Sequence, residues 1–193
     1  MSSKRVLTDR ESALPALAEA FREHGFEGAT LASLSKATGL GKGSLYNFFP
    51  GGKEEMMEAV LENIDGWFAN AIFQPLEQGV DPAAAVTAMF DDVTEYFRSG
   101  RRVCVVGSLG LNSAGEAFSA RVKDYFARWI SALAHCLEVG RVPPALALDL
   151  AEEAVSGIQG AIVLARALGD DASFRRIVRR HQTALLDALN RYA

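Results

Sequence analysis

Apolar residues recur at spacings of three and four along almost the whole chain, which is the period of helices that bury one face. Only 6 prolines interrupt the 193 residues, and no stretch combines the strict alternation and β-branched enrichment typical of a strand. The first such face carries Leu14, Leu17, Ala18 and Phe21. The sequence therefore predicts an all-α fold, and strand-based architectures are excluded at the outset.

Capping signals predict where the helices begin and end. A box formed by Thr8 and Glu11 is expected to open the first helix, which should end near Gly25. Pro15 lies inside this pattern and predicts either a kink or a start close to Ser12.

Further helices are expected from the same kind of signal later in the chain. Asp81, followed by a proline, predicts a helix start that should be broken again at residues 99–102. Helices are expected over about 116–138 and 143–168, and Asp171 is expected to cap the last one.

Residues 30–48 predict two short helices, over 30–38 and 42–48, joined by a glycine-containing turn. Gly39 can take the positive φ that such a turn requires. The expected buried set is Leu34, Ala37, Leu40 and Leu45, and Ala37 is small enough to let the two helices cross closely. This arrangement is a helix-turn-helix, whose second helix reads the major groove of DNA.

The same stretch resembles the N-terminal signature of the TetR family of transcriptional regulators. The matching residues occur in order over the first third of the chain: Thr30, Gly39, Gly43, Ser44, Leu45, Tyr46, Phe49, Lys53 and Glu54. Two departures stand out. Gly51 and Gly52 make the Phe-Pro-Gly-Gly-Lys-Glu segment one residue longer than the commonest spacing, a form associated with one branch, and Asn47-Phe48 replaces the frequent His- or Tyr-rich pair.

The resemblance implies an N-terminal three-helix DNA-binding domain, placed at residues 1–56, and a helical ligand-binding and dimerisation domain at 57–193. It implies a homodimeric regulator, most often a repressor, that leaves a palindromic operator when a small, largely apolar effector binds. The residues expected to contact double-stranded DNA are Thr30, Lys42, Gly43, Ser44, Tyr46, Asn47 and Lys53.

The charge distribution agrees with a reader of DNA at one end of the chain. The net charge of −4 argues against non-specific coating of nucleic acid. However, residues 1–53 hold 7 Lys and Arg against 5 Asp and Glu, a charge of +2, which leaves −6 for the rest. Because +2 is small for a phosphate-binding surface, the sequence predicts two subunits on one palindromic site.

The C-terminal part offers candidates for two further sites, each with a simpler alternative. A two-fold interface of the last two helices would use Gly157, Ala161, Phe174, Ile177 and Leu185, unless these residues face their own core. An effector pocket between helices would be lined by Phe68, Phe90, Cys104, Phe126 and Trp129, unless these side chains are ordinary core.

Three alternative functions were weighed against a ligand-released repressor. Cys104, with two arginines close by, would make a thiol-based electrophile or redox sensor if it is not an inert buried cysteine. A ligand-independent DNA-binding or interaction module fits the same motif. An enzyme is not expected, because no nucleophile–base or carboxylate pair has motif spacing.

Other site types and locations are not indicated by the sequence. We expect no cofactor and no metal, since the histidines and cysteines lack ligand spacing. No signal segment or membrane-spanning run is found, so a cytoplasmic protein without a membrane partner is expected. The arginine pairs 175–176 and 179–180 are read as a solvated helix face rather than a second nucleic-acid patch.

Overall fold

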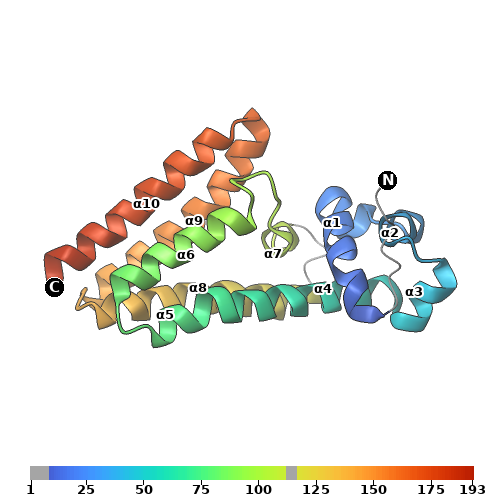
Figure 1. Ribbon diagram of the computed structural model, residues 1–193, viewed down its shortest axis with the longest axis horizontal. Helices are drawn as coiled ribbons and strands as arrows, with labels where there is room; N and C mark the ends of the chain where they lie inside the picture. Colours follow the sequence, from blue (N-terminus) through green and yellow to red (C-terminus); the bar gives the residue numbers. More distant parts are fainter. Residues whose placement is uncertain (1–8, 112–116) are drawn as a thin grey trace, which may run out of the picture. The chain divides into compact units, whose positions relative to one another are not determined.

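The computed structural model describes residues 9–111 and 117–193, and every regular element within these ranges is helical (Figure 1). The elements are α1 (Arg10–Gly28), α2 (Leu31–Thr38), α3 (Lys42–Phe48), α4 (Gly52–Phe68), the π-helix η1 (Ala69–Phe73), α5 (Gln74–Gln78), α6 (Pro82–Tyr96), α7 (Val105–Leu109), α8 (Ser119–Val139), α9 (Pro144–Leu168) and α10 (Asp171–Tyr192). The all-α prediction is confirmed.

The chain divides into two compact units. The N-terminal unit comprises Met1–Asp65 and Val105–Arg121, and the C-terminal unit comprises Gly66–Cys104 and Val122–Ala193. The divisions fall within α4 and near the start of α8, so both helices contribute to both units. The sequence-based division at residue 56 was drawn by function and remains a prediction; it did not include α7 with the N-terminal residues.

The N-terminal unit is organised around α1, which packs against α2 and α7. Its core contains the predicted face of α1 together with Leu34, Leu45 and Phe49, all of which are buried. Arg121 bonds to Glu58 at 2.7 Å and to Asp65 at 3.4 Å, which ties the start of α8 to α4. The short helices are therefore held by a continuous apolar core and a small ionic network at its edge.

The C-terminal unit is built on a hairpin of α9 and α10, which lie side by side in antiparallel directions, with α6 against α10 (Figure 1). Gly169 ends α9 in the left-handed conformation, with φ of 63°, which a glycine adopts without steric cost. The predicted stripe of α6, Val86, Phe90, Val93 and Phe97, is buried. No helix within the described residues is long and apolar enough to cross a membrane.

The predicted cap of α6 is confirmed, whereas the predicted cap of α10 is displaced by one residue. Asp81 accepts a hydrogen bond from the Ala84 amide at 3.0 Å, as expected. The cap of α10 is Asp170, which accepts from the Ala172 amide at 2.9 Å, and not Asp171, which is the first helical residue. Two adjacent aspartates leave the sequence ambiguous by one position.

The start of α1 also differs from the prediction. Asp9 caps it, accepting from the Ser12 amide at 2.7 Å, and Ser12 completes the capping box instead of Glu11. Thr8, the expected cap, lies outside the described residues. Pro15 is accommodated inside a helix that begins at Arg10, and the backbone interruption falls at Gly25, where φ is 68°.

Candidate nucleic-acid interface and effector region

The turn between α2 and α3 is fixed by its own side chains. Gly39 has φ of 72° and donates its amide to the Ser35 carbonyl at 2.9 Å. The Thr38 hydroxyl donates to the Leu34 carbonyl at 2.8 Å and accepts from the Leu40 amide at 3.3 Å. The Ser35 hydroxyl donates to the Leu40 carbonyl. These bonds satisfy the backbone groups at the end of α2, so the direction of α3 is set locally.

The core of this turn differs from the predicted set in two residues. Leu34 and Leu45 are fully buried as expected, but Ala37 is exposed and Leu40 is half-buried. Thr38 takes the buried position, with 6% of its surface exposed. A threonine is accepted there because its hydroxyl bonds to its own helix backbone, a possibility that apolar periodicity does not reveal.

One side of α3 forms the candidate DNA-reading surface. Leu45 alone within the helix is fully buried, while Lys42, Gly43, Ser44 and Asn47 are exposed and Tyr46 exposes 49% of its surface. A helix that presents a cation, a hydroxyl, an amide and a phenol offers donors and acceptors for base edges and phosphates. All five residues predicted on α3 thus lie where solvent reaches them.

The two remaining residues of the predicted site have partners within the chain. Thr30 caps α2, accepting from the Ser33 amide at 3.1 Å, and is exposed. The Lys53 ammonium lies 4.6 Å from the centre of the Phe26 ring and 3.4 Å from the Glu27 carbonyl oxygen, so it fastens α4 to α1. A phosphate contact by Lys53 remains a prediction that requires this side chain to turn outward.

Gly51 and Gly52, the glycine pair that lengthens the segment at the start of α4, have a defined conformation. Gly52 has φ of 70° and donates to the Phe49 carbonyl at 2.9 Å, while the Gly51 amide donates to the Glu55 carboxylate at 2.7 Å. The same carboxylate pairs with Arg10 at 3.3 Å. The extra residue is therefore absorbed in a turn that is closed by the first turn of α4.

The residues predicted for an effector pocket lie in the C-terminal unit and are mostly core. Phe68 and Trp129 expose 0% of their surface, Phe90 exposes 1% and Cys104 exposes 6%, whereas Phe126 is half-buried. The ring of Phe68 stands at the centre of an aromatic cluster, with the Trp129 centroid at 5.3 Å. The cluster also includes two tyrosines that the sequence reasoning missed, Tyr96 at 5.1 Å and Tyr125 at 4.9 Å from Phe68.

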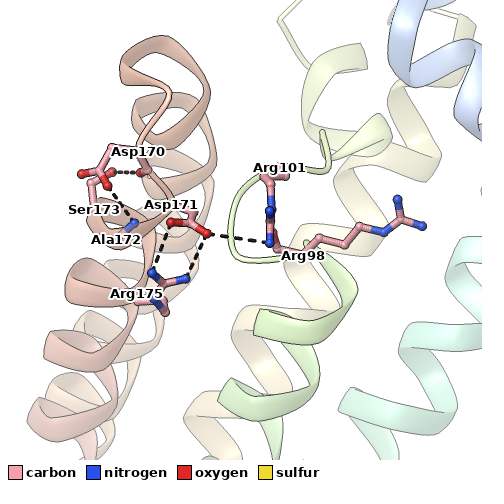
Figure 2. A network of polar contacts seen from close by, with 7 residues as sticks. All are labelled: Arg98, Arg101, Asp170, Asp171, Ala172, Ser173 and Arg175. Atoms are coloured by element: carbon pink, nitrogen blue, oxygen red, sulfur yellow. Dashed lines mark hydrogen bonds and ion pairs between the residues drawn. The ribbon is translucent and has the colours of Figure 1, made fainter.

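Residues 98–102, which follow α6, form a tight turn packed against the α9–α10 hairpin, and we call this turn the clamp. Arg98, Ser99 and Gly100 all have positive φ, and a Cβ on Gly100 would lie 2.6 Å from that of Ala165 and 3.0 Å from the Phe174 ring. Figure 2 shows Asp171 of α10 between Arg175, at 3.1 Å, and Arg101, at 3.7 Å. The hydrogen bond from Arg175 and the two positive charges hold the pKa of Asp171 below its usual value.

Two surface hollows of this unit involve none of the predicted effector residues. One, of about 520 Å³, lies beside the clamp and is lined by Gly100, Arg101, Ala165, Arg166, Gly169 and Asp171. Another, of about 550 Å³, has Asn70 of η1 and Gln74 and Gln78 of α5 on one side, and Ala84 and Ala88 of α6 on the other. Both are open at the surface, unlike the aromatic cluster.

The residues predicted for a dimer interface are distributed between core and surface. Ala161 and Phe174 expose 0% and Leu185 exposes 1%, so these three pack within the chain's own hairpin. Gly157 and Ile177 are half-buried, and the His181 ring lies directly over Gly157, where a Cβ would come within 2.1 Å of its Nε2. In the single chain these three are therefore core residues, and a part for any of the five in a subunit interface remains a prediction.

Both cysteines are buried in the C-terminal unit. Burial, with the nearby charge of Asp81, raises the pKa of the Cys136 thiol to about 11. Such a thiol is almost entirely protonated at neutral pH and is a poor nucleophile. Among the described residues, no group of three or more His, Cys, Asp or Glu is placed to hold a metal ion.

Two protein families match this chain, one in its N-terminal part and one in its C-terminal part. The family described as bacterial regulatory proteins, tetR family, matches residues 14–60, which hold the helix-turn-helix. The family described as transcriptional regulator LmrA/YxaF-like, C-terminal domain, matches residues 82–180. The chain therefore belongs to the TetR family of transcriptional regulators. Its C-terminal domain is of the LmrA/YxaF-like type, and the matching families are regulators, not enzymes.

Individual relatives extend this likeness over the whole chain. The HTH-type transcriptional regulator Rv0196 of Mycobacterium tuberculosis (strain ATCC 25618 / H37Rv) is 27% identical over 190 residues, covering 93% of this chain and 95% of the relative. A TetR transcriptional regulator from Legionella pneumophila has the same fold, with a TM-score of 0.80, 18% identity, and coverage of 93% and 98%. CifR, a TetR family regulator solved with 26-bp double-strand operator DNA, has a TM-score of 0.67, 21% identity, and coverage of 98% and 100%.

Proposed function

We propose that this chain is a homodimeric, cytoplasmic repressor that binds a palindromic operator through α3 and is released by a small, largely apolar effector. The observation that carries the proposal is the exposed face of α3, on which Lys42, Ser44, Tyr46 and Asn47 stand together on a helix anchored by Leu45. The operator complex of CifR shows that a protein of this fold binds double-strand DNA. The Phe-Pro-Gly-Gly-Lys-Glu segment is proposed to mark a branch of the family.

Two copies are needed for tight and specific binding. The charge of +2 over residues 1–53 supplies few phosphate contacts per subunit, and phosphate contacts supply much of the affinity of such proteins. Two readers on a two-fold axis double these contacts and recognise half-sites about 34–36 Å apart, or a multiple of that.

The dimer face is proposed on the exposed sides of α9 and α10. Apolar side chains that are too exposed for a monomer's core lie along α9, with Leu148 at 45%, Val163 at 60%, Leu164 at 46% and Leu168 at 67% exposure. Exposed apolar residues of this kind are typical of a subunit interface. Gly157 and Ile177 are half-buried and are proposed to border this face, whereas Ala161, Phe174 and Leu185 are buried in the single chain.

Release by an effector requires a coupling free energy between the two sites, typically about 1–3 kcal/mol. We propose α4 as the coupling element, because this single helix (Gly52–Phe68) contributes to both compact units and ends on Phe68, the centre of the aromatic cluster. The burial of both thiols favours a ligand-released regulator over a thiol sensor at Cys104.

The decisive experiment is a mobility-shift titration with the DNA upstream of the chain's own gene, with competitor DNA present. Lys42→Ala should weaken specific binding, because α3 loses a cation that we place against the groove and its phosphates. Lys123→Ala, which removes an equally exposed lysine from α8, should leave binding unchanged. Absence of a salt-sensitive specific shift would contradict the proposal, and equal effects of both substitutions would contradict the role of α3.

A further inference from the structure

Trp129 holds a polar group that the fold does not satisfy. Its side chain exposes 0% of its surface, and its indole Nε1 has no hydrogen-bond acceptor among the described residues. Buried N–H groups in folded proteins almost always have an acceptor. Without one, the hydrogen bond that the group makes to water in the unfolded chain is lost and nothing replaces it. An unmet donor at this depth therefore points to an acceptor supplied from outside the chain.

The surroundings of this indole are aromatic. The nearest ring centroids are those of Phe68 at 5.3 Å and Tyr125 at 5.9 Å, and Phe68 in turn contacts Phe73 at 5.9 Å and Phe97 at 6.4 Å. Ring faces are weak acceptors for an N–H and do not replace an oxygen or nitrogen lone pair. The indole thus has apolar neighbours and one directional donor without an acceptor, a combination of groups that small-molecule sites also use.

A second unmet group lies in the same unit. The Nε2 atom of Gln159, on α9, is also buried without a hydrogen-bond partner among the described residues. Like the indole nitrogen, the amide nitrogen is a donor only. A partner for either group must therefore supply a lone pair and not an N–H group.

We propose that Trp129 Nε1 donates to the effector, and that the effector is an aromatic, largely apolar molecule carrying an acceptor oxygen or nitrogen atom. Pure hydrocarbons leave this donor unmet, and cations place positive charge against it. The inference rests on the proposed function in one respect only, that the C-terminal unit binds a small molecule.

Quinoline and naphthalene provide a matched pair of probes. They have nearly the same shape, but quinoline replaces one C–H by a ring nitrogen that accepts a hydrogen bond and is uncharged at neutral pH. The protein has 2 tryptophans, so ¹⁵N-labelled full-length protein gives two indole N–H resonances. The Trp67→Phe variant leaves Trp129 alone and assigns its signal.

We expect quinoline to move the Trp129 indole proton downfield, as a new hydrogen bond does, and naphthalene to leave it near its starting position. Trp129→Phe should lower the preference for quinoline over naphthalene by about tenfold, the size of one hydrogen bond in a dry site. Trp67→Phe, a matched removal of the other indole, should leave that preference unchanged.

Three results would overturn the inference: an equal response of the Trp129 resonance to both probes, no response while both bind, or no binding of quinoline up to its solubility limit. The resonance arm uses wild-type and Trp67→Phe protein, so it stands even if Trp129→Phe fails to fold. No DNA is present in this experiment. Loss of operator binding would therefore overturn the proposed function alone, and a silent Trp129 would overturn only the effector chemistry.

Discussion

Tyr46 on α3 and Phe68 at the end of α4 represent two opposite ways of building a functional surface. Tyr46 exposes 49% of its surface on a helix with one fully buried residue, whereas Phe68 exposes 0% and stands among six other rings. The first is an exposed helix face, and the second is a packed interior. Substitutions on the exposed face should alter operator binding without altering the free energy of unfolding. Substitutions in the interior should alter the free energy of unfolding without altering operator binding directly.

The largest difference is expected between two single variants, Phe68→Ala and Tyr46→Ala. Phe68→Ala should lower the free energy of unfolding by about 4 kcal/mol, because a fully buried ring is lost and leaves a cavity. Tyr46→Ala should change it by less than about 0.5 kcal/mol, as is usual at exposed positions, but should weaken operator binding by about thirtyfold, or about 2 kcal/mol. Urea denaturation at fixed protein concentration and operator titration measure the two quantities.

A reversed pattern would break this comparison. If Tyr46→Ala destabilised the fold as much as Phe68→Ala does, the face of α3 would be part of the core. If Phe68→Ala lowered operator affinity while unfolding stayed unchanged, the aromatic cluster would act on DNA binding directly.

The same contrast explains what the sequence could predict. The bounds of α3, the Gly39 turn and the exposed residues of the DNA-reading face follow from neighbours within about twenty residues, and sequence spacing reports such local relations. The aromatic cluster joins Phe68 to Tyr96, Tyr125 and Trp129, and only tertiary packing decides which of these rings meet. Phe68 and Trp129 were named because large apolar residues are usually buried, whereas tyrosine is intermediate between core and surface, so spacing alone does not place it.

The prediction of a dimer face meets the same limit. A stripe of apolar residues on α10 indicates a buried face, but it does not say whether the chain or its partner covers it. Phe174 and Leu185 are covered by the chain itself, and the residues left exposed, Leu164 and Leu168, lie on α9. These exposed leucines depart from the pattern that a monomer's own core would impose, and for this reason we place the proposed dimer face on them.

Two glycines with positive φ sharpen the comparison at the level of the backbone. Gly100 has φ of 87° and its Cβ position lies 2.6 Å from Ala165, whereas Gly39 has φ of 72° and nothing within 4 Å of its Cβ position. Gly100→Ala should therefore cost about 3 kcal/mol, from strain plus overpacking, and Gly39→Ala about 1 kcal/mol, from strain alone. Thermal unfolding of both variants under one condition checks the ranking.

Equal costs for the two glycines would show that the contacts of Gly100 relax without penalty. In that case the clamp formed by residues 98–102 is adjustable. A large excess cost at Gly100 instead confirms that α6 and the α9–α10 hairpin are locked together at this point.

The smallest expected effect concerns the protonation of His181 in the α9–α10 hairpin. Burial of His181 over Gly157, with Arg180 beside it and Glu153 opposing, lowers its pKa below the ordinary 6.5. The folded state then binds fewer protons than the unfolded chain, so its contribution to stability is complete above about pH 6.5 and is lost as the pH falls through the lowered pKa. Wild-type protein should thus lose more thermal stability on acidification than His181→Gln does. Parallel melting curves for wild type and His181→Gln at all pH values would mean that the hairpin accepts the charged imidazole. The C-terminal interior would then tolerate a charged side chain as readily as the exposed face of α3 does. The distinction between exposed face and packed core would not extend to the hairpin.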